Sequence, residues 1–184
     1  MKCEIPSCFL NHGHPGACMS AYGVPFKPQR FEPPPLPSRT AKSSSIYIIG
    51  SMRNPRVPLV AKALRELGYD VFDDWYSVGP EADDKWQEYE KARGRTYREA
   101  LAGYHAQHAF ALDKHHLDRC GACVLVAPAG KSGHLELGYM IGRGKPGYIL
   151  LDGEPERFDL MLLFATTIFV SLDELLVSAG KNLP

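Results

Sequence analysis

The segment 132–142, which reads Ser-Gly-His-Leu-Glu-Leu-Gly-Tyr-Met-Ile-Gly, contains the side chain best placed for chemistry, that of Glu136. The segment follows an apolar run, 123–128, that is typical of a buried parallel strand. Glu136 is therefore expected in the first turn of a crossover helix, just past the carboxyl end of that strand, where ligands of open α/β sheets bind. A helix N-terminus favours the ionised form of a carboxylate, as a nucleophile requires. The pattern predicts a catalytic carboxylate.

A structural role is the other interpretation of Glu136. The helix dipole favours an acid in the first turn whatever the function of the protein. A capping box, however, needs Ser or Thr three positions earlier, and residue 133 is glycine. With Ser132 as the cap, Leu135 and not Glu136 would take the reciprocal position. The local sequence leaves a catalytic carboxylate and a simple first-turn acid both open.

Other small and polar residues are expected at the same edge of the sheet. Gly50 and Ser51 end the first apolar run, and Asp73 follows the second. Tyr47 lies within the first run, from which its hydroxyl can reach the edge, although a packed strand aromatic is the alternative. The GxGxxG fingerprint of dinucleotide sites is absent from the sequence. We therefore expect a ligand site that lacks the usual dinucleotide signature.

The loop before Glu136 has the properties of an anion site. Ser132, Gly133 and His134 follow Lys131 near the start of the expected helix, where backbone N–H groups have no partner within the helix. A phosphate group is the anion that such a loop would hold. The alternatives are that Ser132 is a simple N-cap and that His134 points into solvent without a role.

The first eighteen residues contain a set of metal-binding types. Cys3, Cys8, His14 and Cys18 have the types and the tight spacing of zinc ligands, and His12 is the rival of His14. A segment this short cannot bury a core, so a structural zinc would supply its free energy of folding. Unliganded cysteines in a tail are the alternative.

Composition limits the classes of function. Lys and Arg together number 21, as do Asp and Glu, so no long-range field favours nucleic acid or an anionic membrane. We find no transmembrane run and no signal-peptide core. Five cysteines, an odd number, argue against a disulfide framework, and the pair Cys120 and Cys123 is expected to be buried and inert. We expect a soluble, cytoplasmic protein without a membrane partner.

Three segments differ in composition: a Cys/His-rich segment 1–22, a proline-rich linker 23–44 and a domain 45–184. In the domain, apolar runs predict strands at 45–50, 69–72, 123–128, 147–151 and 167–170. A polar insertion occupies 73–94, and helices are predicted at 55–67, 96–118 with a break near Gly103, 134–143, 155–164 and 171–179. This alternation predicts an α/β fold, a small doubly wound parallel sheet of five strands, flavodoxin-like or Rossmann-like.

The domain resembles the nucleoside 2-deoxyribosyltransferase family. The resemblance spans nearly all of 45–178 and is closest to a small phage-like and bacterial branch that reads GxSxHLELG. The segments that carry it are Ile46-Tyr-Ile-Ile-Gly-Ser51, Phe110-Ala-Leu-Asp113, Cys123-Val-Leu-Val126, His134-Leu-Glu-Leu-Gly-Tyr139 and Gly144-Lys-Pro146. It implies an N-glycosyl transferase or hydrolase that needs no cofactor for catalysis.

The resemblance also implies roles for single residues. Glu136 falls on the family's nucleophile, Tyr47 on a tyrosine that touches this carboxylate, and Asp113 on an aspartate that contacts the base. Asp159 falls where the family has an asparagine donated across a dimer interface, which implies a homo-oligomer, a dimer or higher. Two departures concern the base and the acceptor: Asp159 replaces a donor by an acceptor, and 129–131 lack an acid that many members have.

The expected reaction is cleavage of the N-glycosidic bond of a 2′-deoxyribonucleoside or its 5′-monophosphate through a covalent glycosyl intermediate on Glu136. The sugar would then pass to another base or to water. One alternative is a hydrolase of NAD or a signalling nucleotide, of the toll/interleukin-receptor type, which also uses a glutamate. The other is a non-enzymatic nucleotide-binding module. The zinc segment would dock a protein or a nucleic acid.

Overall fold

The computed structural model describes residues 45–181 and residue 183. Their strands form one sheet: β1 (Ser45–Ile49), β2 (Asp70–Phe72), β3 (Ala122–Val126), β4 (Gly147–Leu150) and β5 (Thr167–Phe169). The order across the sheet is β2-β1-β3-β4-β5, and every neighbouring pair is parallel. The predicted five-stranded doubly wound α/β sheet is confirmed, with the flavodoxin-like strand order.

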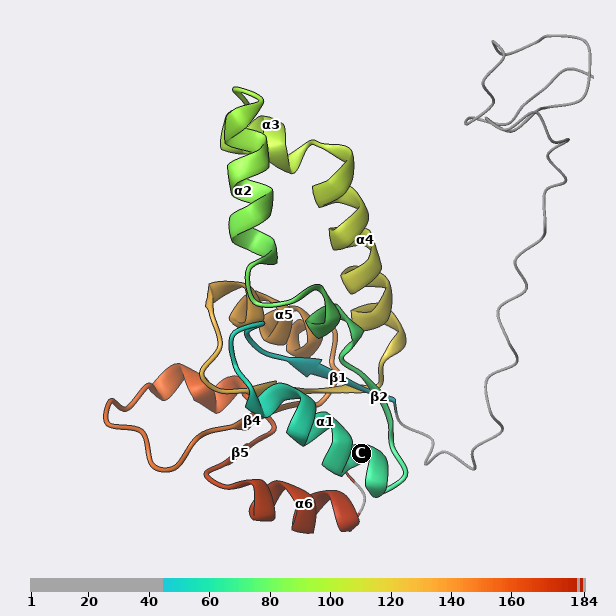
Figure 1. The fold of residues 1–184 in the computed structure, drawn as a ribbon. Helices are drawn as coiled ribbons and strands as arrows, with labels where there is room; N and C mark the ends of the chain where they lie inside the picture. Colours follow the sequence, from blue (N-terminus) through green and yellow to red (C-terminus); the bar gives the residue numbers. More distant parts are fainter. Residues whose placement is uncertain (1–44, 182, 184) are drawn as a thin grey trace, which may run out of the picture. The chain divides into compact units, whose positions relative to one another are not determined.

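Helices cover both faces of the sheet (Figure 1). α1 (Arg56–Glu66) and α6 (Leu172–Gly180) pack on one face, and α4 (Tyr104–Arg119) and α5 (Lys131–Gly142) pack on the other. Alternate residues of β1 show this division, because Ile46 and Ile48 belong to the first core and Tyr47 and Ile49 to the second. Strands that are buried on both faces appear in a sequence as continuous apolar runs, and for this reason the apolar runs predicted the strands.

The insertion between β2 and β3 is largely helical. A 3-10 helix, η1 (Asp74–Val78), leads to α2 (Ala82–Ala92), and α3 (Tyr97–Leu101) precedes α4. In Figure 1, α2, α3 and the first turns of α4 stand away from the sheet. The predicted break near Gly103 is confirmed, since α3 and α4 are separate helices and Gly103 is the N-cap of α4.

Two helices differ from their predicted ranges. α5 begins at Lys131, three residues before the predicted start, with Gly130 as its N-cap. The helix predicted at 155–164 is wrong in its first half, because only a 3-10 helix, η2 (Leu160–Phe164), forms there. Residues 152–159 form bends and irregular backbone instead, with Gly153 at a φ of 91°.

Some predictions are not tested by these residues. The zinc ligands Cys3, Cys8, His14 and Cys18, the rival His12 and the linker 23–44 lie outside the described residues, so the zinc site and the domain boundaries stay predictions. Within 45–181, no group of three or more His, Cys, Asp and Glu side chains is arranged to hold a metal ion. In that same range, no helix is long and apolar enough to cross a membrane. The cytoplasmic location stays a prediction.

Candidate active site

Tyr47, Asp113 and Glu136 come together on the face of the sheet that α4 and α5 cover. They belong to three elements, β1, α4 and α5. Their charges interact, because both carboxylates raise the pKa of the Tyr47 phenol and Asp113 raises the pKa of Glu136. Tyr47 is the register partner of Cys123 on β3, so the group lies on the two central strands whose carboxyl ends form the switch point of this strand order.

The position of Glu136 corrects one expectation from the sequence. Since α5 begins at Lys131, Glu136 lies in the second turn of the helix and not in the first. The helix dipole acts weakly there, because its effect falls off within the first turn. Burial, followed by the charge of Asp113, raises the pKa of Glu136 to about 7. The carboxyl group is therefore balanced between its two protonation states near neutral pH instead of being held ionised.

Asp113 and Tyr47 complete the environment of this carboxyl group. Asp113 is half-buried on α4, and burial raises its pKa above the ordinary value. The charge of Asp113 disfavours ionisation of Glu136, so the two carboxyl groups titrate as a coupled pair that still holds a proton below about pH 7. Tyr47 is buried, and burial raises the pKa of its phenol far above the ordinary value. Tyr47 therefore stays a neutral hydroxyl beside the two carboxyl groups.

The residues beneath the carboxyl groups are apolar and unreactive. Cys120 and Cys123 are free and buried, which confirms the prediction of a buried pair. Burial raises the pKa of both thiols, and that of Cys123 reaches about 12 with a smaller contribution from Glu136. Both thiols are protonated at neutral pH, so neither is a nucleophile.

The predicted binding residues after β1 and β2 are packed into the edge of the sheet. A Cβ on Gly50 would lie 2.6 Å from Cγ2 of Val57, so a side chain does not fit there. Ser51 is partly exposed, and its Oγ accepts a hydrogen bond from the Arg53 N–H at 3.2 Å. Asp73 forms an ion pair with Arg65 of α1, which ties the end of β2 to that helix. Contact of these residues with a substrate stays a prediction.

The N-terminus of α5 is open. Gly130 is the N-cap and no side chain caps the helix, so the interpretation of Ser132 as an N-cap is wrong. Gly133 packs closely on β1, because an added Cβ would lie 3.0 Å from Cγ2 of Ile49. His134 is exposed, with Nδ1 2.9 Å from the Gly130 carbonyl oxygen. An open depression of about 590 Å³ lies here, lined by Ala129, Gly130, Lys131, His134 and Leu135.

A second depression, of about 550 Å³, lies between α5 and η2. Most of its lining is apolar, including Leu137, Ile149 and Leu162, and His134 borders both depressions. Asp159 lines this second depression, and its carboxylate accepts a hydrogen bond from the N–H of Met161 at 2.9 Å. Glu136 lines neither this depression nor the one at the N-terminus of α5.

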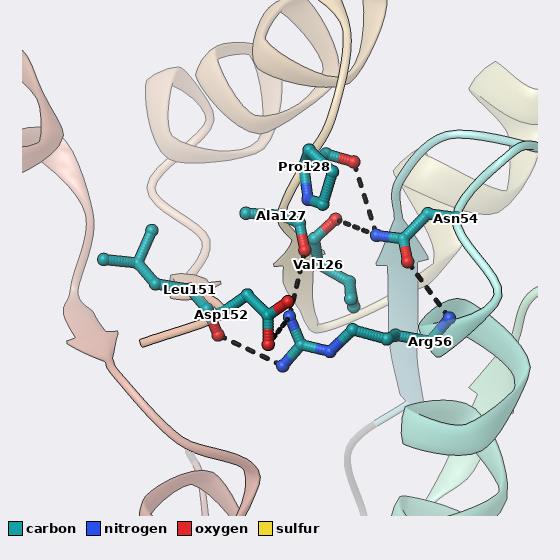
Figure 2. A network of polar contacts seen from close by, with 7 residues as sticks. All are labelled: Asn54, Arg56, Val126, Ala127, Pro128, Leu151 and Asp152. Carbon is teal, nitrogen blue, oxygen red and sulfur yellow. Dashed lines mark hydrogen bonds and ion pairs between the residues drawn. The ribbon is translucent and has the colours of Figure 1, made fainter. Parts of the chain in front are cut away.

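The sequence reasoning missed Asn54, which joins the loops at the edge of the sheet (Figure 2). Asn54 is buried, and its Nδ2 donates to the carbonyl oxygens of Val126 at 3.2 Å and Pro128 at 3.3 Å. Its Oδ1 accepts the backbone N–H of Arg56 at 3.0 Å. The end of β1 is thereby tied to the end of β3, directly before the loop that leads to Glu136.

Arg56 extends the same network to β4 (Figure 2). Its guanidinium donates to the carbonyl oxygens of Ala127 and Leu151, both at 3.1 Å, and pairs with Asp152 at 3.1 Å. Five donors in a rigid fork allow arginine to bridge several loops at once. No sequence motif predicts that Arg56 bridges these loops, because the bridge depends on which strand ends the topology brings together.

Comparison with known proteins supports the fold. No family model matches the chain, and no curated protein matches it. Among solved structures, it is similar to a 2-deoxyribosyltransferase from the psychrotolerant bacterium Bacillus psychrosaccharolyticus, at a TM-score of 0.50 and 17% sequence identity. The alignment covers 77% of this chain and 93% of that one. At this identity the likeness concerns architecture. The chain has the fold of a 2-deoxyribosyltransferase.

Proposed function

We propose that the protein is an N-glycosyl transferase or hydrolase of the nucleoside 2-deoxyribosyltransferase type. Its substrate is a 2′-deoxyribonucleoside or the 5′-monophosphate. The observation that carries the proposal is the pair Glu136 and Asp113, two half-buried carboxyl groups with raised pKa values beside Tyr47. Titratable groups with shifted pKa values near the carboxyl edge of a parallel sheet are typical of an active site. The fold and the segment His134–Tyr139 support the same reaction.

The proposed chemistry divides between the two carboxyl groups. Ionised Glu136 attacks C1′, the C1′–N bond breaks with its electron pair on the base nitrogen, and Asp113 donates a proton to the leaving base. The new C1′–O bond makes a glycosyl ester on Glu136, formed through an oxocarbenium-like state. A second base, or water, then attacks C1′, loses its proton to Asp113 and frees Glu136. Two displacements at C1′ retain its configuration. Tyr47 orients the Glu136 carboxylate.

The open N-terminus of α5 is the proposed phosphate site. Gly130, Lys131 and His134 of this end line the depression, and no side chain caps the helix there. Such groups, with the positive end of the helix dipole, favour a phosphate. Ser132 and Gly133 belong to the same turn, and α5 also carries Glu136. We propose that a 5′-monophosphate bound there directs its sugar toward Glu136, which lies further along the same helix.

We also propose that the protein forms a homo-oligomer. Large apolar side chains are exposed along 158–164, with Phe158 84%, Leu160 73% and Leu163 83% exposed. Apolar patches of this kind mark interaction sites in soluble proteins. Asp159 lies in the same stretch, so contact with a second copy would bring it toward a site other than its own. Aspartate can only accept hydrogen bonds when ionised, which would select bases that present a donor.

Product analysis tests the proposed reaction. The protein is incubated with deoxynucleosides and with their 5′-monophosphates, each with and without a second free base, and the products are separated by chromatography. A new nucleotide that contains the second base indicates transfer, whereas free base together with the sugar phosphate indicates hydrolysis. Absence of base release from every deoxy compound would contradict both forms of the proposal and favour a binding module.

The pH dependence of kcat/KM is expected to report the pair Glu136 and Asp113. The proposed reaction needs Glu136 ionised and one proton on Asp113, and the pair loses its last proton as the pH rises through about 7, so the rate should fall above that pH. Asp113→Asn removes both the proton donor and its charge, so the residual activity should be lower and should no longer fall above pH 7. Steady-state rates between pH 5 and 9 check this. A wild-type rate that stays constant as the pH rises through 7 would contradict the assignment.

The zinc site is proposed on the sequence alone. Full-length protein purified under reducing conditions should contain about one zinc per chain. Cys8→Ala and Cys18→Ala should each lose the metal, because structural sites need all four ligands. Cys120→Ala is the matched control, since this buried thiol lies outside the Cys/His segment. Elemental analysis that finds no zinc in the full-length chain would contradict the site. The docking of a protein or nucleic acid by this segment stays a proposal.

A further inference from the structure

α4 is held to the rest of the domain near its C-terminal end. Of its 16 residues only Leu117 is buried, and its first turns stand away from the sheet (Figure 1). His116 in the same turn stacks on Phe72 of β2, with ring centroids 3.6 Å apart. Asp113 lies one turn before Leu117, on the weakly supported side. Whatever holds the C-terminal turn of α4 therefore also sets the position of Asp113 relative to Glu136.

A second pair of residues lies further along the same two helices, toward their C-terminal ends. α4 and α5 run in the same direction, because each returns from the carboxyl edge to the start of the next strand, β3 or β4. Asp118 lies five residues after Asp113, and Tyr139 lies three residues after Glu136. Asp118 and Tyr139 are therefore about one helical turn further along both helices.

These two side chains form the centre of a polar cluster between the helices. The Tyr139 hydroxyl donates to Oδ1 of Asp118 at 2.5 Å, and Nζ of Lys114 donates to Oδ2 at 2.6 Å. Nε of Arg143 lies 3.6 Å from Oδ1 of Asp118. The charged groups of Lys114 and Arg143 each lie 5.5 Å from the centroid of the Tyr139 ring. α4 contributes Lys114 and Asp118, and Tyr139 and Arg143 come from α5 and its C-cap.

Asp118, at the centre of the cluster, is ionised throughout the physiological pH range. Its hydrogen bonds from Lys114 and Tyr139 lower the pKa of Asp118 to about 2. Hydrogen bonds to an ionised acceptor are stronger than those between neutral groups. Nζ of Lys145 reinforces the contact by donating to the carbonyl oxygens of Leu117 at 2.8 Å and Asp118 at 2.6 Å. Those carbonyls lie in the last turn of α4, where partners within the helix are missing.

We propose that Asp118 and Tyr139 are positioning residues that clamp α4 to α5 and thereby set the separation of Asp113 and Glu136. The inference rests on the proposed function, in that it takes the two carboxyl groups as the reacting pair. Opening the clamp moves Asp113 away from Glu136 and admits water between the helices. Both changes favour the ionised form of Glu136, because its neighbour repels it less and its burial is reduced.

The other groups that face Glu136 do not change in this event. Tyr47 on β1 and Cys123 on β3 interact with it, and both are neutral at working pH. They lie on the sheet and not on α4, so they keep their places when α4 moves. A change in the titration of Glu136 after loss of the clamp can therefore be assigned to Asp113 and to hydration.

The test measures the titration of Glu136 directly, by carbon-detected NMR of protein labelled with ¹³C at glutamate carboxyls. Glu136→Gln identifies the signal. In Tyr139→Phe, which keeps the ring and removes the hydroxyl, the midpoint should fall by about half a pH unit or more. Asp118→Asn should act in the same direction and more strongly, because it also releases Lys114 and Arg143. In both variants kcat for base release should fall about tenfold, as expected for a displaced catalytic group.

Matched controls separate positioning from stability. Tyr148→Phe removes a hydroxyl that has no hydrogen-bond partner among the described residues, on the other face of the sheet. Glu66→Gln breaks the pair with Lys62, which has the same i, i+4 spacing as Lys114 and Asp118. Neither should move the titration of Glu136. An unchanged midpoint in both clamp variants, with or without a lower Tm, would overturn the inference. Wild-type turnover by Glu136→Gln would instead sink the proposed function and leave the titration result intact.

Discussion

Glu136→Gln is expected to lower the rate of base release by more than about a hundredfold, because the amide cannot form the glycosyl ester. The substitution is nearly isosteric and lies in the second turn of α5, so the helix itself should persist. Tyr47→Phe is the graded comparison. It removes only the hydroxyl that orients the carboxylate, and its cost should be clearly smaller than that of Glu136→Gln. Rates of base release from a deoxynucleotide check both variants.

The same substitution should stabilise the protein at alkaline pH. The raised pKa of Glu136 means that the folded state holds this proton more tightly than the unfolded state does. The resulting stabilisation is complete below the unfolded pKa, about 4.3, and is lost as the pH rises through about 7. At pH 8 the ionised, half-buried carboxylate opposes folding by at most about 4 kcal/mol, and a neutral amide removes this cost.

Thermal unfolding of the two proteins at pH 5 and pH 8 separates loss of chemistry from loss of structure. The Tm of Glu136→Gln should exceed that of the wild type at pH 8, and the difference should shrink at pH 5. A variant that is inactive but more stable at pH 8 would show that Glu136 serves the reaction at a cost to the stability of the fold. An inactive variant that is less stable at both pH values would point to a structural role for Glu136.

The sheet was predictable from the sequence because its strands are buried on both faces. β1, β3 and β4 are short, continuous apolar runs, and no helical pattern competes with them. The start of α5 was predicted three residues too late, because the sequence gives little indication of where this helix begins. Gly130 and Gly133 flank it and no side chain caps it, so the sequence carries no start signal there. This error put Glu136 in the wrong turn and reversed the expected direction of its pKa shift.

The residues that support the site could not be predicted, because their contacts depend on tertiary packing. Asn54 binds carbonyl groups more than seventy residues away in the chain (Figure 2). Asp118 and Tyr139 meet only because α4 and α5 are neighbours on one face of the sheet. A single sequence shows residue types and spacing, whereas a shifted pKa requires knowledge of what surrounds the group. The residues proposed to react were thus accessible to sequence reasoning, and the groups that hold them in place were not.

The substrate is expected to contain 2′-deoxyribose, with kcat/KM for the matching ribonucleotide lower by at least about a hundredfold. Glu136 must approach C1′, and a 2′-hydroxyl next to that carbon would crowd the carboxylate and donate a hydrogen bond to it. The hydroxyl also withdraws electron density and so raises the barrier to an oxocarbenium-like state. The 5′-monophosphate should have the lower KM, because the open N-terminus of α5 offers a phosphate site that a free nucleoside leaves empty.

The decisive assay follows free base from a panel of deoxynucleosides, their monophosphates, the matching ribonucleotides and NAD. Glu136→Gln, incubated with the same panel, shows which release depends on the site. NAD should release no nicotinamide, because the sequence lacks the GxGxxG turn that accommodates a pyrophosphate. Nicotinamide release that depends on Glu136, with no base release from the deoxy compounds, would mean that the same carboxylate pair acts on a ribose substrate. In that case the 2′-hydroxyl would be a group the site binds, and the deoxyribosyl assignment would be wrong.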